Sequence, residues 1–278
     1  MTEPDADTFR DVQVGSLVPY VLITFGIPWG LLGLYLALPA GATGWLGEIS
    51  ASHPGFILAV WSPAIAAFAI VVRHGGWPAL RSFLSRALLW RCPAAWYAYL
   101  LVGMPLVFYA GAVIKGASLT EPLAGQNVVS LLSAMAFMLV LGPVEEFGWR
   151  GLALPLLQRR LAPLWAALLL GLVWGVWHLP AFLLSGTPQS GWGFMPFLVG
   201  SVCLSVIVTP LFNAAGGSIL LAVLYHFQAN NPLWPDAQPY DTVILVFVAA
   251  IVVWLNRRTM LVRGTGATAV VPAGARTR

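Results

Sequence analysis

The sequence predicts an all-α protein, a polytopic transmembrane helical bundle of about eight spans. Hydrophobic residues make up 59% of the 278 residues, charged residues only 9%, and the mean hydropathy is +0.83. A soluble domain carries about 25% charged residues. The apolar runs are also long and continuous, as a helix crossing the hydrocarbon core requires, whereas barrel strands are short and alternate. An open sheet is excluded because lipid cannot satisfy the polar groups at its edges.

Taken in order, the apolar runs divide into predicted spans, each of roughly 17–25 residues. They are 16–38, 54–73, 95–116, 127–148, 163–184, 194–213, 216–234 and 241–256.

Three further segments complete the expected organisation. Residues 1–15 are acidic and lack the basic region of a signal peptide, so the first apolar run is interpreted as a retained span. The stretch 75–93 interleaves apolar residues with arginines and predicts a short interfacial amphipathic helix. The transmembrane domain is expected over 16–260, and the Gly, Ala, Thr and Arg of 261–278 predict a disordered cytoplasmic tail.

Charge placement predicts the orientation. If the N-terminus is cytoplasmic and eight spans alternate, all 13 arginines fall on the cytoplasmic side and Lys115 alone lies outside. This matches the excess of basic residues in cytoplasmic loops, so both termini are expected in the cytoplasm. The net charge of +4 then needs no nucleic acid, because the basic residues orient the chain and can meet anionic lipid of the bilayer.

The informative polar residues lie inside the apolar runs. Glu145 and Glu146 end the fourth run, and the fifth and seventh runs carry His178 and His226. Ionisable groups are costly within a bilayer, so such residues indicate a functional site. Each has a polar or aromatic neighbour one helical turn away: Arg150 follows Glu146, Trp174 precedes His178, and Asn230 follows His226.

The spacing predicts that these groups meet. Glu146 lies 16 residues before Ala162, at the turn between the fourth and fifth spans, and His178 lies 16 residues after it. Equal separation from the turn of an antiparallel hairpin gives equal depth, about 24 Å at a rise of about 1.5 Å per residue. His226, on a span parallel to the fifth, is expected to converge on the same level.

These residue types suit hydrolysis. A carboxylate among apolar helices with a partner histidine can activate a water, and a second histidine with an asparagine can donate hydrogen bonds to an oxyanion. Glu145, His178 and His226 also match a site for one divalent metal such as zinc, although no HExxH signature is present. Both routes stay open, as do structural roles: a Glu146–Arg150 helix pair, histidines bonding between helices, and tryptophans that only pack.

The motifs Glu145-Glu146-x-x-x-Arg150, Trp174-x-x-x-His178 and His226-x-x-x-Asn230 resemble those of the CPBP intramembrane proteases. This family includes the type II CAAX prenyl endopeptidases and bacteriocin-processing or self-immunity proteins. The resemblance covers roughly residues 128–232 and is closest to the bacterial branch, which implies a bacterial inner membrane. Trp174 departs from the phenylalanine usual at that position.

The resemblance implies roles for the same residues. Glu145 and His178 would activate the water, Glu146 and Arg150 would position the carboxylate, and His226 with Asn230 would stabilise the oxyanion. It also implies an eight-helix bundle whose cavity opens to the cytoplasm, and a membrane-associated or lipidated peptide or protein as substrate.

Two other functions fit the pattern. One is a non-proteolytic scaffold or immunity factor that keeps the fold, and the other is a transporter or proton relay using the same Glu and His groups. The sequence lacks the paired internal repeats typical of transporters, which disfavours the relay.

Overall fold

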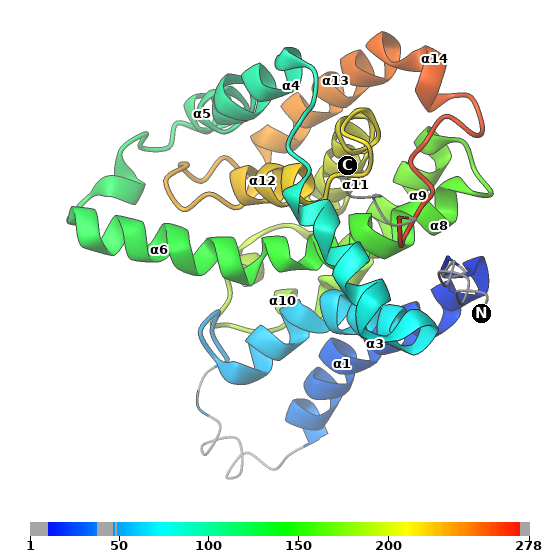
Figure 1. Ribbon diagram of the computed structural model, residues 1–278. Helices are drawn as coiled ribbons and strands as arrows, with labels where there is room; N and C mark the ends of the chain where they lie inside the picture. The colour runs from blue at the N-terminus through cyan, green and yellow to red at the C-terminus, as the bar shows by residue number, and fades with distance from the viewer. Residues whose placement is uncertain (1–10, 38–46, 48, 273–278) are drawn as a thin grey trace, which may run out of the picture.

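The computed structural model describes residues 11–37, 47 and 49–272. Over these residues the chain is helical and has no strand, which confirms the predicted fold class (Figure 1). The longer helices are α1 Leu17–Ala37, α3 Pro54–Ser85, α5 Met104–Lys115, α6 Val128–Leu141, α9 Pro163–Trp177, α11 Phe194–Ala214, α12 Ile219–Ala229 and α13 Tyr240–Leu255.

Short helical segments extend or join these helices. The short α-helices are α4 Ala94–Ala98, α7 Glu146–Gly148, α8 Leu154–Gln158, α10 Leu179–Phe182 and α14 Arg257–Met260. Single 3₁₀ turns are η1 Val14–Ser16, η2 Arg86–Leu88, η4 Glu121–Leu123, η5 Pro143–Glu145 and η7 Pro188–Gly191. Two π-helical turns, η3 Tyr99–Gly103 and η6 Trp149–Ala153, continue α4 into α5 and α7 into α8.

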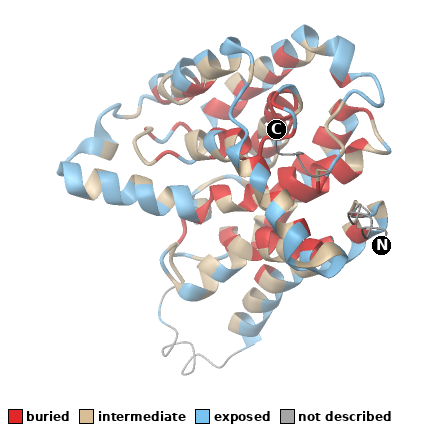
Figure 2. Cartoon of the chain, viewed as in Figure 1, coloured by how far each residue is buried: buried red, intermediate tan, exposed pale blue. Residues whose placement is uncertain are grey.

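Each predicted apolar run contains a helix in the part of the chain that the structure describes. Within the described residues, 6 stretches are long and apolar enough to cross a membrane, so the chain is an integral membrane protein. The helices α12 and α13 are apolar but shorter, with 11 and 16 residues. A total of eight spans therefore stays a prediction. Figure 2 shows exposed residues along the outer sides of α1, α5 and α6 and buried residues in the middle of the bundle.

The helices run between two opposite faces of the bundle. The terminal face is formed by 11–16, 86–91, 158–163, 213–218 and 256–272, and the loop face by 49–53, 116–127, 183–193 and 230–239. At the terminal face Arg159 pairs with Asp11, while at the loop face Lys115 pairs with Asp236 at 2.7 Å. The helix α11 has 21 residues and connects the two faces, which places them about 31 Å apart.

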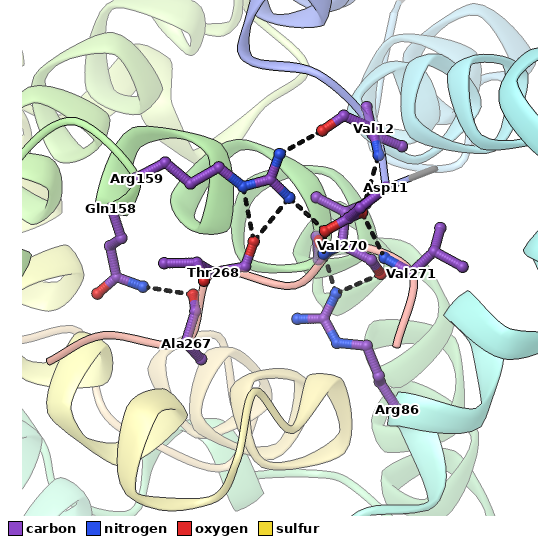
Figure 3. Close-up of polar contacts among 10 residues, drawn as sticks. Asp11, Val12, Arg86, Gln158, Arg159, Ala267, Thr268, Val270 and Val271 are labelled. Carbon is purple, nitrogen blue, oxygen red and sulfur yellow. Dashed lines mark hydrogen bonds and ion pairs between the residues drawn. The ribbon is translucent and has the colours of Figure 1, made fainter. Parts of the chain in front are cut away.

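The prediction that 261–278 is disordered is wrong for residues 261–272, and 273–278 lie outside the described residues. Val270 is fully buried in the core, and the backbone around it is held by side chains from distant segments. Asp11 accepts from the amides of Val270 and Val271 at 3.2 and 3.0 Å (Figure 3). Gln158 donates to the carbonyl of Ala267 at 2.9 Å. The amino-acid composition of 261–278 could not predict this ordered structure, because the contacts that hold it come from other segments of the chain.

The expected interfacial helix over 75–93 is only partly observed. Helix α3 kinks at Gly75 and Gly76, where Gly76 has a positive φ of 62°, and then continues to Ser85. Arg86, expected at the interface, is instead buried with a 2% exposed side chain. Its guanidinium donates to the carbonyls of Gly151, Gly217 and Val270 at 2.6, 3.0 and 3.1 Å. Three segments are thereby tied to one cation, whose Nε and Nη1 donate to carbonyl oxygens instead of lipid headgroups.

Candidate active site

An apolar cavity of about 740 Å³ lies between the helices, and the predicted functional residues gather on its wall. Glu145, Trp174, His178, His226 and Asn230 all line it, although they come from three separate segments: η5, α9 and α12 with their C-terminal caps. The predicted partners Glu146 and Arg150 are not part of the wall and lie behind it. The convergence expected from the spacing is therefore observed.

A broken helix presents the paired glutamates. The regular turns of α6 end at Leu141, and Gly142-Pro143 lead into the 3₁₀ turn η5 that carries Glu145. Proline removes a backbone donor and disfavours a continuous helix. The π-helical turn η6 follows at Trp149, a type of irregularity found often at functional sites. Gly148 lets this segment approach α3, because a Cβ there would lie 2.5 Å from the backbone of Pro63.

Two indole groups hold one oxygen of Glu145. Its Oε2 accepts from Nε1 of Trp174 at 2.8 Å and from Nε1 of Trp149 at 3.1 Å. Glu145 is 3% exposed, so these donors replace the water that a free carboxylate would bind. With Oε2 taken by two donors, Oε1 is the oxygen available to a molecule in the cavity.

Glu146 makes a separate polar cluster behind the wall. Its Oε1 accepts from Arg150 at 2.8 Å and from Nδ1 of His226 at 2.7 Å, and all three side chains are buried. The guanidinium of Arg150 also lies 4.8 Å from the ring centroid of Trp174. The pair Glu146–Arg150 predicted from the helical spacing is present, and its additional contacts make it part of the site.

Trp174 connects the two clusters. Besides its bond to Glu145, its carbonyl accepts from Nδ1 of His178 at 2.9 Å. Its ring packs edge-on against His178 and His226, with centroid separations of 5.5 and 5.3 Å. Because a carbonyl only accepts, Nδ1 of His178 carries the hydrogen and the neutral ring has its lone pair on Nε2. His178 therefore offers an acceptor nitrogen at the cavity wall.

Asn230 reaches the site because Gly142 has no side chain. A Cβ on Gly142 would lie 2.7 Å from Nδ2 of Asn230 and 3.6 Å from Nε2 of His226. Asn230 is the C-cap of α12, and its backbone N–H donates to the carbonyl of His226 at 3.1 Å. The histidine and asparagine thus lie one turn apart, next to the point where α6 breaks.

The arrangement does not fit a metal site. Among the described residues, no three His, Cys, Asp or Glu side chains come together as ligands of one ion. Of the two routes left open by the sequence, the residues present favour water activation by glutamate and histidine.

Sequence reasoning missed two contributors. Trp149 is one of the tryptophans expected only to pack, yet it is fully buried and donates to Glu145. The signal was available, since Glu145 and Trp149 are four residues apart, the same spacing that links Glu146 to Arg150. The role of Gly142 had no such signal, because it depends on contact with α12.

Comparison with known proteins agrees with the motifs. Residues 127–232 match the family described as type II CAAX prenyl endopeptidase Rce1-like. This segment is therefore similar to that family. A "CAAX prenyl protease 2" of Methanococcus maripaludis is 29% identical to the chain over 134 residues, covering 44% of this chain and 49% of that protein. The chain thus aligns with about half the length of this relative. The Rce1-like segment contains every predicted site residue, and the family resemblance is confirmed.

Proposed function

We propose that this protein is an intramembrane endopeptidase that hydrolyses a peptide bond of a membrane-associated or lipidated peptide or protein. The observation that carries the proposal is the position of Glu145, His178, His226 and Asn230 around one apolar cavity inside a membrane protein. Peptide hydrolysis needs a base for the water and donors for the oxyanion. The similarity to a CAAX prenyl protease supports the same reaction class.

Glu145 and His178 are proposed to activate the water. The two indole bonds orient the Glu145 carboxylate, and the bond from His178 to the Trp174 carbonyl fixes the imidazole so that Nε2 can accept a hydrogen bond. A water held between Oε1 of Glu145 and Nε2 of His178 would lose a proton as it attacks the scissile carbonyl. That proton would then pass to the leaving amine, so no net charge accumulates in the apolar site.

His226 and Asn230 are proposed to stabilise the oxyanion. The Nδ2 amide of Asn230 is a donor, and His226 donates from Nε2 when its ring is doubly protonated, a form whose Nδ1–H the Glu146 carboxylate accepts. Removing one donor of this kind costs roughly 10²–10³ in kcat in a protease. Arg150 is 1% exposed and paired with Glu146, so it is assigned to positioning and not to a substrate carboxylate.

The substrate class follows from the wall of the cavity. Most of the lining is aliphatic or aromatic, including Leu31, Phe56, Phe108, Trp192 and Phe197. An acyl chain, a prenyl chain or an apolar peptide would lose water-exposed surface there, at about 25 cal/mol per Å².

The alternative is a scaffold or immunity factor that uses the fold without proteolysis. The test compares purified wild type with Glu145→Gln, His178→Ala and Asn230→Ala in liposomes, using quenched fluorescent lipidated peptides. The proposal expects cleavage by the wild type and at least about a 10²-fold loss in each variant. Absence of cleavage, together with cellular activity in Glu145→Gln, would instead establish the scaffold.

A further inference from the structure

The two faces of the bundle carry very different charge. In the described part of the chain, every arginine except Arg150 belongs to the terminal face or to the ends of helices next to it. They are Arg73, Arg81, Arg86, Arg91, Arg159, Arg160, Arg257, Arg258 and Arg263. At the loop face the cationic side chain is Lys115, and it is neutralised by Asp236 at 2.7 Å.

The cavity reaches the loop face. Its rim includes Pro188, Gln189 and Trp192 from the connection between α10 and α11, and Asp236 from the connection between α12 and α13. Helices α1, α3, α11 and α13 line the cavity with their halves nearer to this face, as Tyr35 near the end of α1 does.

The terminal face is closed in the same structure. None of its described residues lines the cavity. Instead, side chains at this face hold the docked residues 267–271 across it (Figure 3). Arg86, Gln158 and Arg159 donate hydrogen bonds to the backbone carbonyls of Val270, Ala267 and Thr268, respectively.

The distribution of arginines between the two faces indicates which face lies on the cytoplasmic side of the membrane. Cytoplasmic loops carry an excess of arginine and lysine within about 15–20 residues of the span ends, and this bias sets the orientation of polytopic proteins. It assigns the terminal face to the cytoplasm. The sequence-based expectation of cytoplasmic termini and the expectation of a cavity open to the cytoplasm therefore cannot both be right, because the termini and the mouth lie at opposite faces.

We propose that the cavity opens on the non-cytoplasmic side of the membrane, so that the substrate is a peptide or lipid-anchored segment approaching from that side. The inference about substrate rests on the proposed endopeptidase function, whereas the side of the opening does not. A peptide confined to the cytoplasm would have no path to Glu145 through the terminal face.

Two serines provide a matched pair of reporters for the orientation. Ser85 lies at the terminal face and Ser190 at the cavity rim; both are exposed. Each hydroxyl donates to the carbonyl three residues earlier, at 2.7 Å for Ser85 and 2.8 Å for Ser190. Each would be changed to cysteine in a chain whose native thiols, Cys92 and Cys203, are replaced by serine.

Intact bacterial spheroplasts would then meet a membrane-impermeant maleimide. The proposal expects Ser190→Cys to react at once and Ser85→Cys only after the membrane is permeabilised. The reverse pattern, or equal reaction of both, overturns it. Met138→Cys on the cavity wall should react with a small impermeant methanethiosulfonate from the Ser190 side. Its reaction from the Ser85 side would show that the cavity opens at the terminal face, and would also overturn the proposal.

A second arm separates the opening from the chemistry. Proteoliposomes whose orientation has been measured by the same labelling receive a soluble quenched peptide outside only. Cleavage should scale with the fraction of molecules that present Ser190 outward, and cleavage that scales with outward Ser85 contradicts the proposal. If no orientation cleaves while the labelling pattern holds, the endopeptidase function fails and the side of the opening stands.

Discussion

Replacing Trp174 by phenylalanine isolates one hydrogen bond to the proposed catalytic carboxylate. Phenylalanine keeps an aromatic ring beside His178, His226 and Arg150 but loses the N–H that reaches Oε2 of Glu145 at 2.8 Å. A hydrogen bond to a charged group contributes about 1.5–3 kcal/mol. If the carboxylate is held less firmly in the transition state by that amount, kcat falls about 10- to 100-fold.

The split between kcat and KM identifies the role. The cavity wall keeps its shape in Trp174→Phe, so KM for a lipidated peptide should stay within about threefold while kcat falls. The control is Trp177→Phe, since the Trp177 indole donates to the carbonyl of Thr24 at 2.9 Å and not to Glu145. That variant should lose about 1 kcal/mol of stability and keep a kcat near the wild-type value. Equal kcat in the two variants, or a loss confined to KM, would refute the assignment of Trp174 as a positioning residue.

Four further outcomes are expected. Glu146→Gln leaves the buried Arg150 without its charge partner, so thermal unfolding in detergent should show a loss of about 3–5 kcal/mol, whereas Glu145→Gln should unfold near the wild-type temperature. Gly142→Ala places a Cβ 2.7 Å from Nδ2 of Asn230, so kcat should fall at least about tenfold with stability changed by less than about 2 kcal/mol. Incubation with a divalent-metal chelator should leave peptide cleavage unchanged, and restoration by added zinc after a loss would contradict this. Asp11→Asn weakens the ion pair with Arg159, so limited proteolysis should cut the segment 261–272 faster than in the wild type.

Much of the fold was predictable because lipid leaves few choices. Long apolar runs must be helical in a membrane, so composition and run length were enough to predict the class and place every helical run. The site was predictable for a related reason, since Glu145, His178 and His226 stand out against a chain with only 9% charged residues. The turn near Ala162 then predicts equal depth for His178 and for Glu146, the neighbour of Glu145.

The remaining features depend on contacts between distant segments. Residues 261–272 look disordered in composition, but Asp11 and Arg86 supply partners for their backbone that no local pattern reveals. The same limit applies to Gly142, whose role exists only against Asn230. The face at which the cavity opens could be identified only from the paths of all the helices. The sequence of a loop does not show whether the loop covers a pocket or borders one.

The position of Arg86 has a consequence for biogenesis. Residues 267–271 leave the ribosome after α1 to α14 have been made, yet they supply the Val270 carbonyl to which this buried guanidinium donates. Until they dock, Arg86 and Asp11 lack part of their hydrogen bonding, and an under-paired buried charge costs several kcal/mol. Packing of the arginine-rich face therefore finishes after α13 and α14 have been translated. A chain that stops before residue 267 would leave this face incompletely packed, and proteases that remove incomplete membrane proteins would be expected to cut it there.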